Sequence, residues 1–233
     1  MFWRWSNCSV CLGGRVFSSI GDFTKFLCGT SIERPLPVPT RADWPEMEFE
    51  GVQAVSDTDS ALIRDLFRPL RIDWIDGHCT KPGKLGLTIL PGRQDMGRDL
   101  PDDIAAITAA GVTHIVPLIT DEEFVEYGVD DLLEAYQQAG LTVHRLPILD
   151  QGVCSLQEMG VMVAWLQTHL DAGANILIHC VGGLGRSGML TACYLTSHNL
   201  DAATAIDEVR RARSPRAVES AVQEAFIRDF AGR

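Results

Sequence analysis

A short stretch near the end of the chain combines residue types that can do chemistry on an anion. Cys180 and Arg186 enclose five residues, three of them glycine: Val181, Gly182, Gly183, Leu184 and Gly185. Glycines allow a tight turn that aims successive N–H groups at one point, which makes a nest for an anion. A planar guanidinium can grip two oxygens of that anion. The spacing therefore predicts an oxyanion-binding loop with a thiol at its base.

The elements on either side strengthen this prediction. An apolar run over 175–179 predicts a strand before the loop, and a helix is expected to begin near Arg186. The positive end of that helix favours both an anion and a thiolate, so we expect the pKa of Cys180 to lie well below the free value of about 8.5. Such a thiolate, held under a phosphate, is placed for in-line attack on phosphorus. A buried, inert cysteine beside a turn is the alternative, but it leaves Arg186 unexplained.

The run from His179 to Ser187 resembles the signature of the cysteine-dependent protein tyrosine and dual-specificity phosphatases. The resemblance implies that Cys180 is a nucleophile that becomes a phosphocysteine, and that Arg186 binds phosphate and stabilises the transition state. It implies that Ser187 eases departure of the thiolate. His179 would order the loop and help to lower the thiol pKa. Residues 181–186 would bind the substrate phosphate, without a metal or cofactor.

A phosphatase also needs an acid to protonate the departing oxygen. Asp150 lies in a predicted loop, at the relative position where the phosphatase family carries such an acid, and Gly152 beside it suits a hinge. We predict that Asp150 is the acid and then the base for the hydrolytic water. A turn-capping role before the helix at 155 is the alternative. Cys154, close by, is a candidate for a disulfide with an oxidised Cys180.

Further segments are similar to the kinase-associated phosphatase group, a dual-specificity branch also called the cyclin-dependent kinase inhibitor type. They are residues 87–92, 132–140 and 147–150, and the similarity covers about residues 70–230. It implies a phosphoprotein substrate, with a cyclin-dependent kinase as one candidate. Loop residues 181–185 carry no charge, whereas phosphoinositide phosphatases of this superfamily usually carry loop lysines. A non-protein phosphate ester, a non-catalytic phosphoprotein-binding module, and an enzyme of sulfur or arsenate remain alternatives.

The elements around these residues alternate between strands and helices. Strands are expected at 85–90, 114–119, 141–146 and 175–179, with helices at 101–110, 129–139 and 155–170 and three more beginning near 186, 201 and 218. This predicts an α/β fold with a mostly parallel central sheet and helices on both faces. The phosphatase domain should span residues 61–233. Residues 1–60 read as an N-terminal extension or linker that is partly disordered.

Charge and cysteine usage limit the partners. The formal net charge of −11 disfavours nucleic acid and anionic membrane surfaces, and no apolar run is long enough to span a bilayer. Seven irregularly spaced cysteines favour a reduced, cytoplasmic protein, and the lone Cys8–Cys11 pair lacks further metal ligands. The arginines at 210, 211, 213 and 216 could bind a second anionic group, although a solvated helix end is the preferred interpretation.

Overall fold

The structure is a computed structural model that describes residues 10–12, 15–17, 69–75 and 82–233. The chain forms two units, residues 1–54 and 55–233. In the first unit, β1 (Val10–Leu12) pairs antiparallel with β2 (Arg15–Phe17). The remaining predictions for residues 1–60, including partial disorder and a role for Cys8, fall outside the described residues and stay predictions.

A five-stranded sheet forms the centre of the second unit, in the order β3-β4-β7-β5-β6. Its strands are β3 (Asp73–Trp74), β4 (Leu85–Thr88), β5 (His114–Pro117), β6 (Thr142–Val143) and β7 (Ile176–His179). Within this sheet β3 alone runs antiparallel to its neighbour, so the predicted mostly parallel sheet is confirmed. The sequence did not predict β3, and the strand expected over 141–146 is limited to the two residues of β6.

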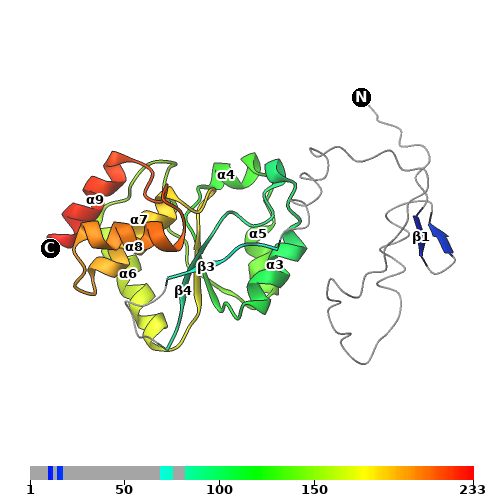
Figure 1. The fold of residues 1–233 in the computed structure, drawn as a ribbon, viewed down its shortest axis with the longest axis horizontal. Helices are drawn as coiled ribbons and strands as arrows, with labels where there is room; N and C mark the ends of the chain where they lie inside the picture. The colour runs from blue at the N-terminus through cyan, green and yellow to red at the C-terminus, as the bar shows by residue number, and fades with distance from the viewer. Residues whose placement is uncertain (1–9, 13–14, 18–68, 76–81) are drawn as a thin grey trace. The chain divides into compact units, whose positions relative to one another are not determined.

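Helices cover both faces of this sheet, as predicted (Figure 1). One side carries α3 (Leu100–Ala109), α4 (Asp121–Glu126) and α5 (Leu132–Gln138), and the other α6 (Leu156–Asp171), α7 (Gly185–Thr196), α8 (Ala202–Ala212) and α9 (Ala221–Ala231). Successive side chains of a strand point to opposite faces. Accordingly, Ile176 and Ile178 join the core beneath α6–α9, and Leu177 joins the core beneath α3–α5. No helix among the described residues is long and apolar enough to span a membrane.

The central strand β7 delivers the cysteine loop to one edge of the sheet. It is buried along its whole length and pairs with β4 and β5, so that His179 lies opposite both Thr88 and Pro117. Because these three strands are parallel, their carboxyl ends meet at one edge, where ligands bind in such sheets. The loop 180–184, the start of α4 and the segment that carries Asp150 therefore converge there.

Candidate active site

The loop between β7 and α7 turns its carbonyl oxygens outward. The oxygen of Val181 accepts hydrogen bonds from the N–H of Leu90 at 3.0 Å and from the side chain of Arg93 at 3.1 Å. Arg213 donates to the next two carbonyl oxygens, those of Gly182 at 3.2 Å and Gly183 at 2.9 Å. Each of these carbonyls is thereby held away from the centre of the loop.

The next carbonyl, that of Leu184, accepts from the N–H groups of Gly188 at 3.0 Å and Val218 at 3.2 Å. In a trans peptide the C=O and the following N–H point in opposite directions, and the described chain has no cis peptide bond. The N–H groups of residues 182–185 therefore face the interior of the loop, as the anion nest predicted from the glycines requires. Gly183 is essential to this turn, since its φ is 66° and a Cβ there would lie 2.1 Å from the Thr88 oxygen.

Cys180 lies at the base of this nest. Its side chain is buried, and the hydroxyl of Ser187, also buried, donates a hydrogen bond to its sulfur at 3.0 Å. The positive charges of Arg186 and Arg93 act on Cys180 electrostatically.

His179 is fully buried and neutral. Burial lowers its pKa to about 4, and burial raises the pKa of Tyr136 well above its usual value. Nδ1 of His179 lies 3.2 Å from the carbonyl oxygen of Cys180, and Nε2 lies 2.9 Å from the hydroxyl of Tyr136. A carbonyl can only accept, so Nδ1 carries the hydrogen and Nε2 accepts from the tyrosine. His179 thus fixes the Cys180 peptide and brings no positive charge to the thiol.

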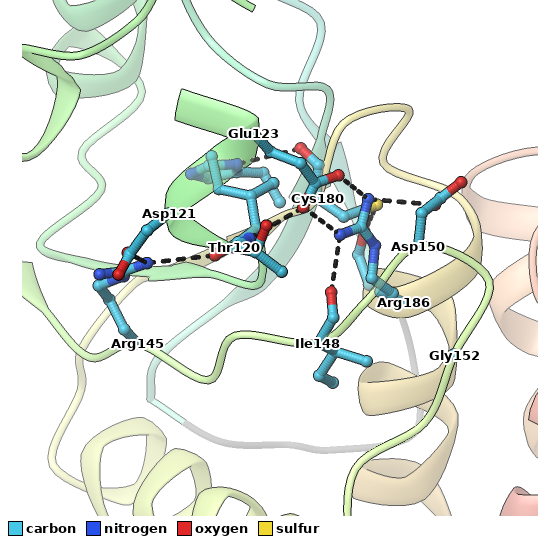
Figure 2. A network of polar contacts seen from close by, with 12 residues as sticks. Thr120, Asp121, Glu123, Arg145, Ile148, Asp150, Gly152, Cys180 and Arg186 are labelled. Carbon is cyan, nitrogen blue, oxygen red and sulfur yellow. Dashed lines mark hydrogen bonds and ion pairs between the residues drawn. The ribbon is translucent and has the colours of Figure 1, made fainter. Parts of the chain in front are cut away.

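The Glu123 carboxylate, which the sequence analysis did not identify, positions the Arg186 side chain. The two terminal nitrogens of Arg186 donate to Glu123 on α4 at 2.7 and 2.8 Å, and Nη1 also donates to the oxygen of Ile148 at 2.8 Å (Figure 2). Glu123 also accepts from the N–H of Thr120 at 2.9 Å. Nε of Arg186 is buried and has no hydrogen-bond partner. The edge formed by Nε and Nη2 is therefore the one left for a ligand.

Both members of this pair are charged. Burial by itself raises the pKa of Glu123, but hydrogen bonds from Arg186 and Thr120 outweigh it and the pKa is lowered. Burial likewise disfavours the charged form of Arg186, and Glu123 outweighs it, so the Arg186 pKa is raised. The orientation of the Arg186 guanidinium is therefore fixed by the protein's own groups.

Asp150 lies on a turn facing Arg186. Its side chain is 63% exposed, and Oδ1 lies 3.1 Å from Nη2 of Arg186 (Figure 2). The turn is anchored on both sides, since the N–H of Ile148 donates to Leu118 at 3.0 Å and Gln223 donates to the oxygen of Gly152 at 3.3 Å. The structure thus brings Asp150 to the same place as the cysteine loop.

The other polar groups have mainly structural surroundings. Within the described part of the chain, no three His, Cys, Asp or Glu side chains are grouped to hold a metal ion. Cys154 is half-buried, burial raises its pKa to about 11, and it acts electrostatically on Cys193. Its disulfide with Cys180 stays a prediction.

Of the four C-terminal arginines, Arg213 is well buried and braces the loop, with Asp73 holding its far end at 2.5 Å. The preferred interpretation of these arginines as a solvated helix end is therefore wrong for Arg213. Arg210 and Arg211 pair with acids, Glu224 at 2.8 Å and Glu208 at 2.6 Å.

Comparison with known proteins identifies the family. The family model described as cyclin-dependent kinase inhibitor 3 matches residues 49–206. Human cyclin-dependent kinase inhibitor 3 is 32% identical over 180 residues, which cover 74% of this chain and 84% of the human protein. The rat protein of the same name is 32% identical, covering 70% and 79%. The chain belongs to the cyclin-dependent kinase inhibitor 3 family.

Solved structures agree with this assignment. Kinase associated phosphatase, crystallised with its catalytic-site cysteine replaced by serine, is 30% identical, with a TM-score of 0.68, and the match covers 71% of this chain and 96% of that one. The active form of Tk-PTP is 27% identical, with a TM-score of 0.57, covering 70% and 97%. The chain is therefore a phosphatase of the protein tyrosine and dual-specificity class, as the resemblance implied.

Proposed function

We propose that this phosphatase hydrolyses phosphotyrosine and phosphoserine or phosphothreonine in proteins through a phosphocysteine on Cys180. The observation that carries the proposal is the set of donors grouped around one sulfur: the inward N–H groups, the unpartnered Nε of Arg186 and the hydroxyl of Ser187. A dianionic phosphoryl group matches this set in charge and in the number of its oxygens.

The reaction then runs in two displacements. The Cys180 thiolate attacks phosphorus while Asp150 gives a proton to the departing oxygen, which breaks the ester P–O bond and forms a P–S bond. Asp150, now a carboxylate, accepts a proton from water as that water attacks phosphorus. The P–S bond breaks, inorganic phosphate leaves, and Ser187 stabilises the returning thiolate.

Substrate binding also frees the acid. The Asp150 carboxylate lies against Nη2 of Arg186, on the edge that a phosphate oxygen would take. A bound phosphoryl group would displace it toward the leaving oxygen, since both anions cannot share that donor. His179 has a positioning role, because it is neutral and its ring hydrogen-bonds to the Cys180 carbonyl and to the Tyr136 hydroxyl.

The test is turnover of an aryl phosphate in the presence of EDTA by wild type, Cys180→Ser and the matched control Cys154→Ser. Wild type and the control should turn over, and mass spectrometry of acid-quenched wild type should find a phosphoryl group on the Cys180 peptide. Turnover by Cys180→Ser would contradict the mechanism. Asp150→Asn should slow substrates with poor leaving groups most, and an equal loss on all leaving groups would contradict its acid role.

A cyclin-dependent kinase is the candidate protein target, supported by the names of the relatives. The test compares a phosphorylated cyclin-dependent kinase with a phosphopeptide copied from its activation loop. A much higher kcat/KM on the intact kinase would support a docked kinase substrate, and equal values would contradict it. A phosphoinositide is the competing substrate, and preferential turnover of it in the same assay would overturn the protein assignment.

A further inference from the structure

The hollow above the phosphate-binding loop is strongly acidic. It has a volume of about 500 Å³, and five of the residues that line it are carboxylates: Glu122, Glu123, Asp150, Glu126 and Glu219. None of the described residues that line it is a lysine or an arginine. This composition is unexpected in a site for a phosphate dianion, because like charges repel.

Two of these carboxylates share one guanidinium, and the other three have no close ion pair within the described part of the chain. Glu123 and Asp150 both contact Arg186. Glu122 and Glu126 are exposed, and the described residues offer neither of them an ion-pair partner. Glu219 lies 4.0 Å from Arg216, whose side chain is 80% exposed, so that this pair is weak.

Helix stability explains Glu122, which lies in the first turn of α4, but it does not explain Glu126. Glu122 and Glu126 are a like-charged pair four residues apart, which destabilises a helix. Glu126 is moreover the last residue of α4, where the helix dipole favours a cation. Positions that oppose local stability in this way are expected at functional sites.

Glu219 follows a residue whose backbone is strained. The preceding residue, Val218, has a φ of 60°, a left-handed conformation that is unusual for a β-branched side chain. The N–H of Val218 donates to Leu184 in the phosphate-binding loop, and the N–H of Glu219 donates to Gln223 at 3.1 Å. A carboxylate oxygen of Glu219 consequently lies beside Gly185, 2.7 Å from where a Cβ would be. This backbone strain keeps the carboxylate at the rim.

The group behind the hollow identifies what enters it. Glu123 and Asp150 line the hollow and both contact Arg186, whose Nε is unpartnered although the side chain is 1% exposed. One phosphoryl group therefore fits at the bottom, and cations fit around the mouth. A peptide cation about 8 Å from a solvent-exposed carboxylate of the rim should change the affinity by about two- to fivefold per pair.

We infer that the enzyme selects phosphorylated protein segments that carry Lys or Arg beside the phosphoresidue, and that Glu122, Glu126 and Glu219 determine this specificity. The inference rests on the proposed phosphatase function and names its substrate class. Ligands with several phosphates are disfavoured by the same three carboxylates.

The test uses phosphopeptides of one length that differ only in the flanking residues, which are Arg, Ala or Glu. Values of kcat/KM should fall in that order, with about a tenfold span between Arg and Glu at low salt, and the span should shrink as salt is raised. The triple variant E122Q/E126Q/E219Q should lose most of the span. A control with three exposed acids changed elsewhere, E134Q/D207N/D229N, has the same net charge and should keep it.

Aryl phosphate turnover, measured in parallel, separates this inference from the proposed function. If aryl phosphate is turned over but kcat/KM is equal for all three peptides, the inference is wrong and the proposed function stands. The same conclusion follows if both triple variants lose the difference in kcat/KM between Arg- and Glu-flanked peptides equally. If no substrate is turned over, calorimetry of the same peptides with Cys180→Ser tests the inference directly. Equal affinity for the Arg- and Glu-flanked peptides would overturn it there.

Discussion

Replacing Glu123 by glutamine tests whether the buried ion pair positions Arg186. Glutamine keeps one oxygen to accept from the guanidinium and replaces the other with an NH₂ group, which would face an N–H donor. Contacts at 2.7 and 2.8 Å between side chains that are 1% and 11% exposed then become one hydrogen bond and one repulsive contact. Breaking a buried pair from one side costs about 3–5 kcal/mol, so we expect unfolding free energy to fall by about 3 kcal/mol.

The catalytic effect follows from the same contact. A guanidinium freed on one side shifts, and a displacement of about 1 Å at a reacting centre costs about 100-fold. We expect kcat/KM for an aryl phosphate to fall by about this factor in Glu123→Gln, measured by steady-state kinetics alongside urea unfolding. Glu134→Gln, an exposed acid with one hydrogen bond to Gln138, serves as the matched control. A folded Glu123→Gln enzyme within threefold of wild type would refute the reasoning.

The remaining predictions concern pH, the loop turn and its brace. The folded-state pKa of Glu123 lies below its ordinary value of 4.5. Its contribution to stability is therefore present above that pH and lost as pH falls through the folded-state pKa. Urea unfolding should show this loss of stability in wild type and not in Glu123→Gln. Gly183→Ala should abolish aryl phosphate turnover, because the new Cβ would lie 2.1 Å from a backbone oxygen of β4. Gly160→Ala, whose new Cβ would have no atom within 4 Å, should stabilise α6 by up to about 1 kcal/mol in thermal unfolding. Arg213→Met should weaken inhibition by vanadate about tenfold, because it releases two loop carbonyls. Arg211→Met, which removes a surface ion pair on α8, should not weaken it; equal effects of the two variants would contradict the role of Arg213 as a brace.

The cysteine loop could be predicted because its chemistry is contiguous. The cysteine, the glycines and the arginine lie within a few residues, between a strand and a helix whose signals are local. The capping box that begins α6 is another local signal, and Ser155 and Glu158 make both of its hydrogen bonds, at 3.1 and 2.9 Å. Where the determining contacts are close in sequence, residue types and spacing are sufficient.

The missed residues depend on contacts between distant parts of the chain. Glu123 is 63 positions from Arg186, and Asp73 is 140 positions from Arg213. A Thr-x-x-Glu pattern at 120–123 was available as a helix-start signal, but α4 is only six residues long. An arginine near the end of a helix has a sufficient local explanation in the helix dipole, so its role as a brace could not be distinguished without the fold.

The contact between Asp150 and Arg186 means that the protein's own carboxylate competes with incoming anions for this guanidinium. Any free anion must dislodge a carboxylate before it can use that edge of the guanidinium, and the carboxylate returns whenever the anion loosens. A phosphoester with contacts outside the loop can offset this exchange, but a small inorganic ion cannot. We therefore expect weak product inhibition by phosphate, because the Asp150 carboxylate hinders the binding of small anions from the surrounding solution.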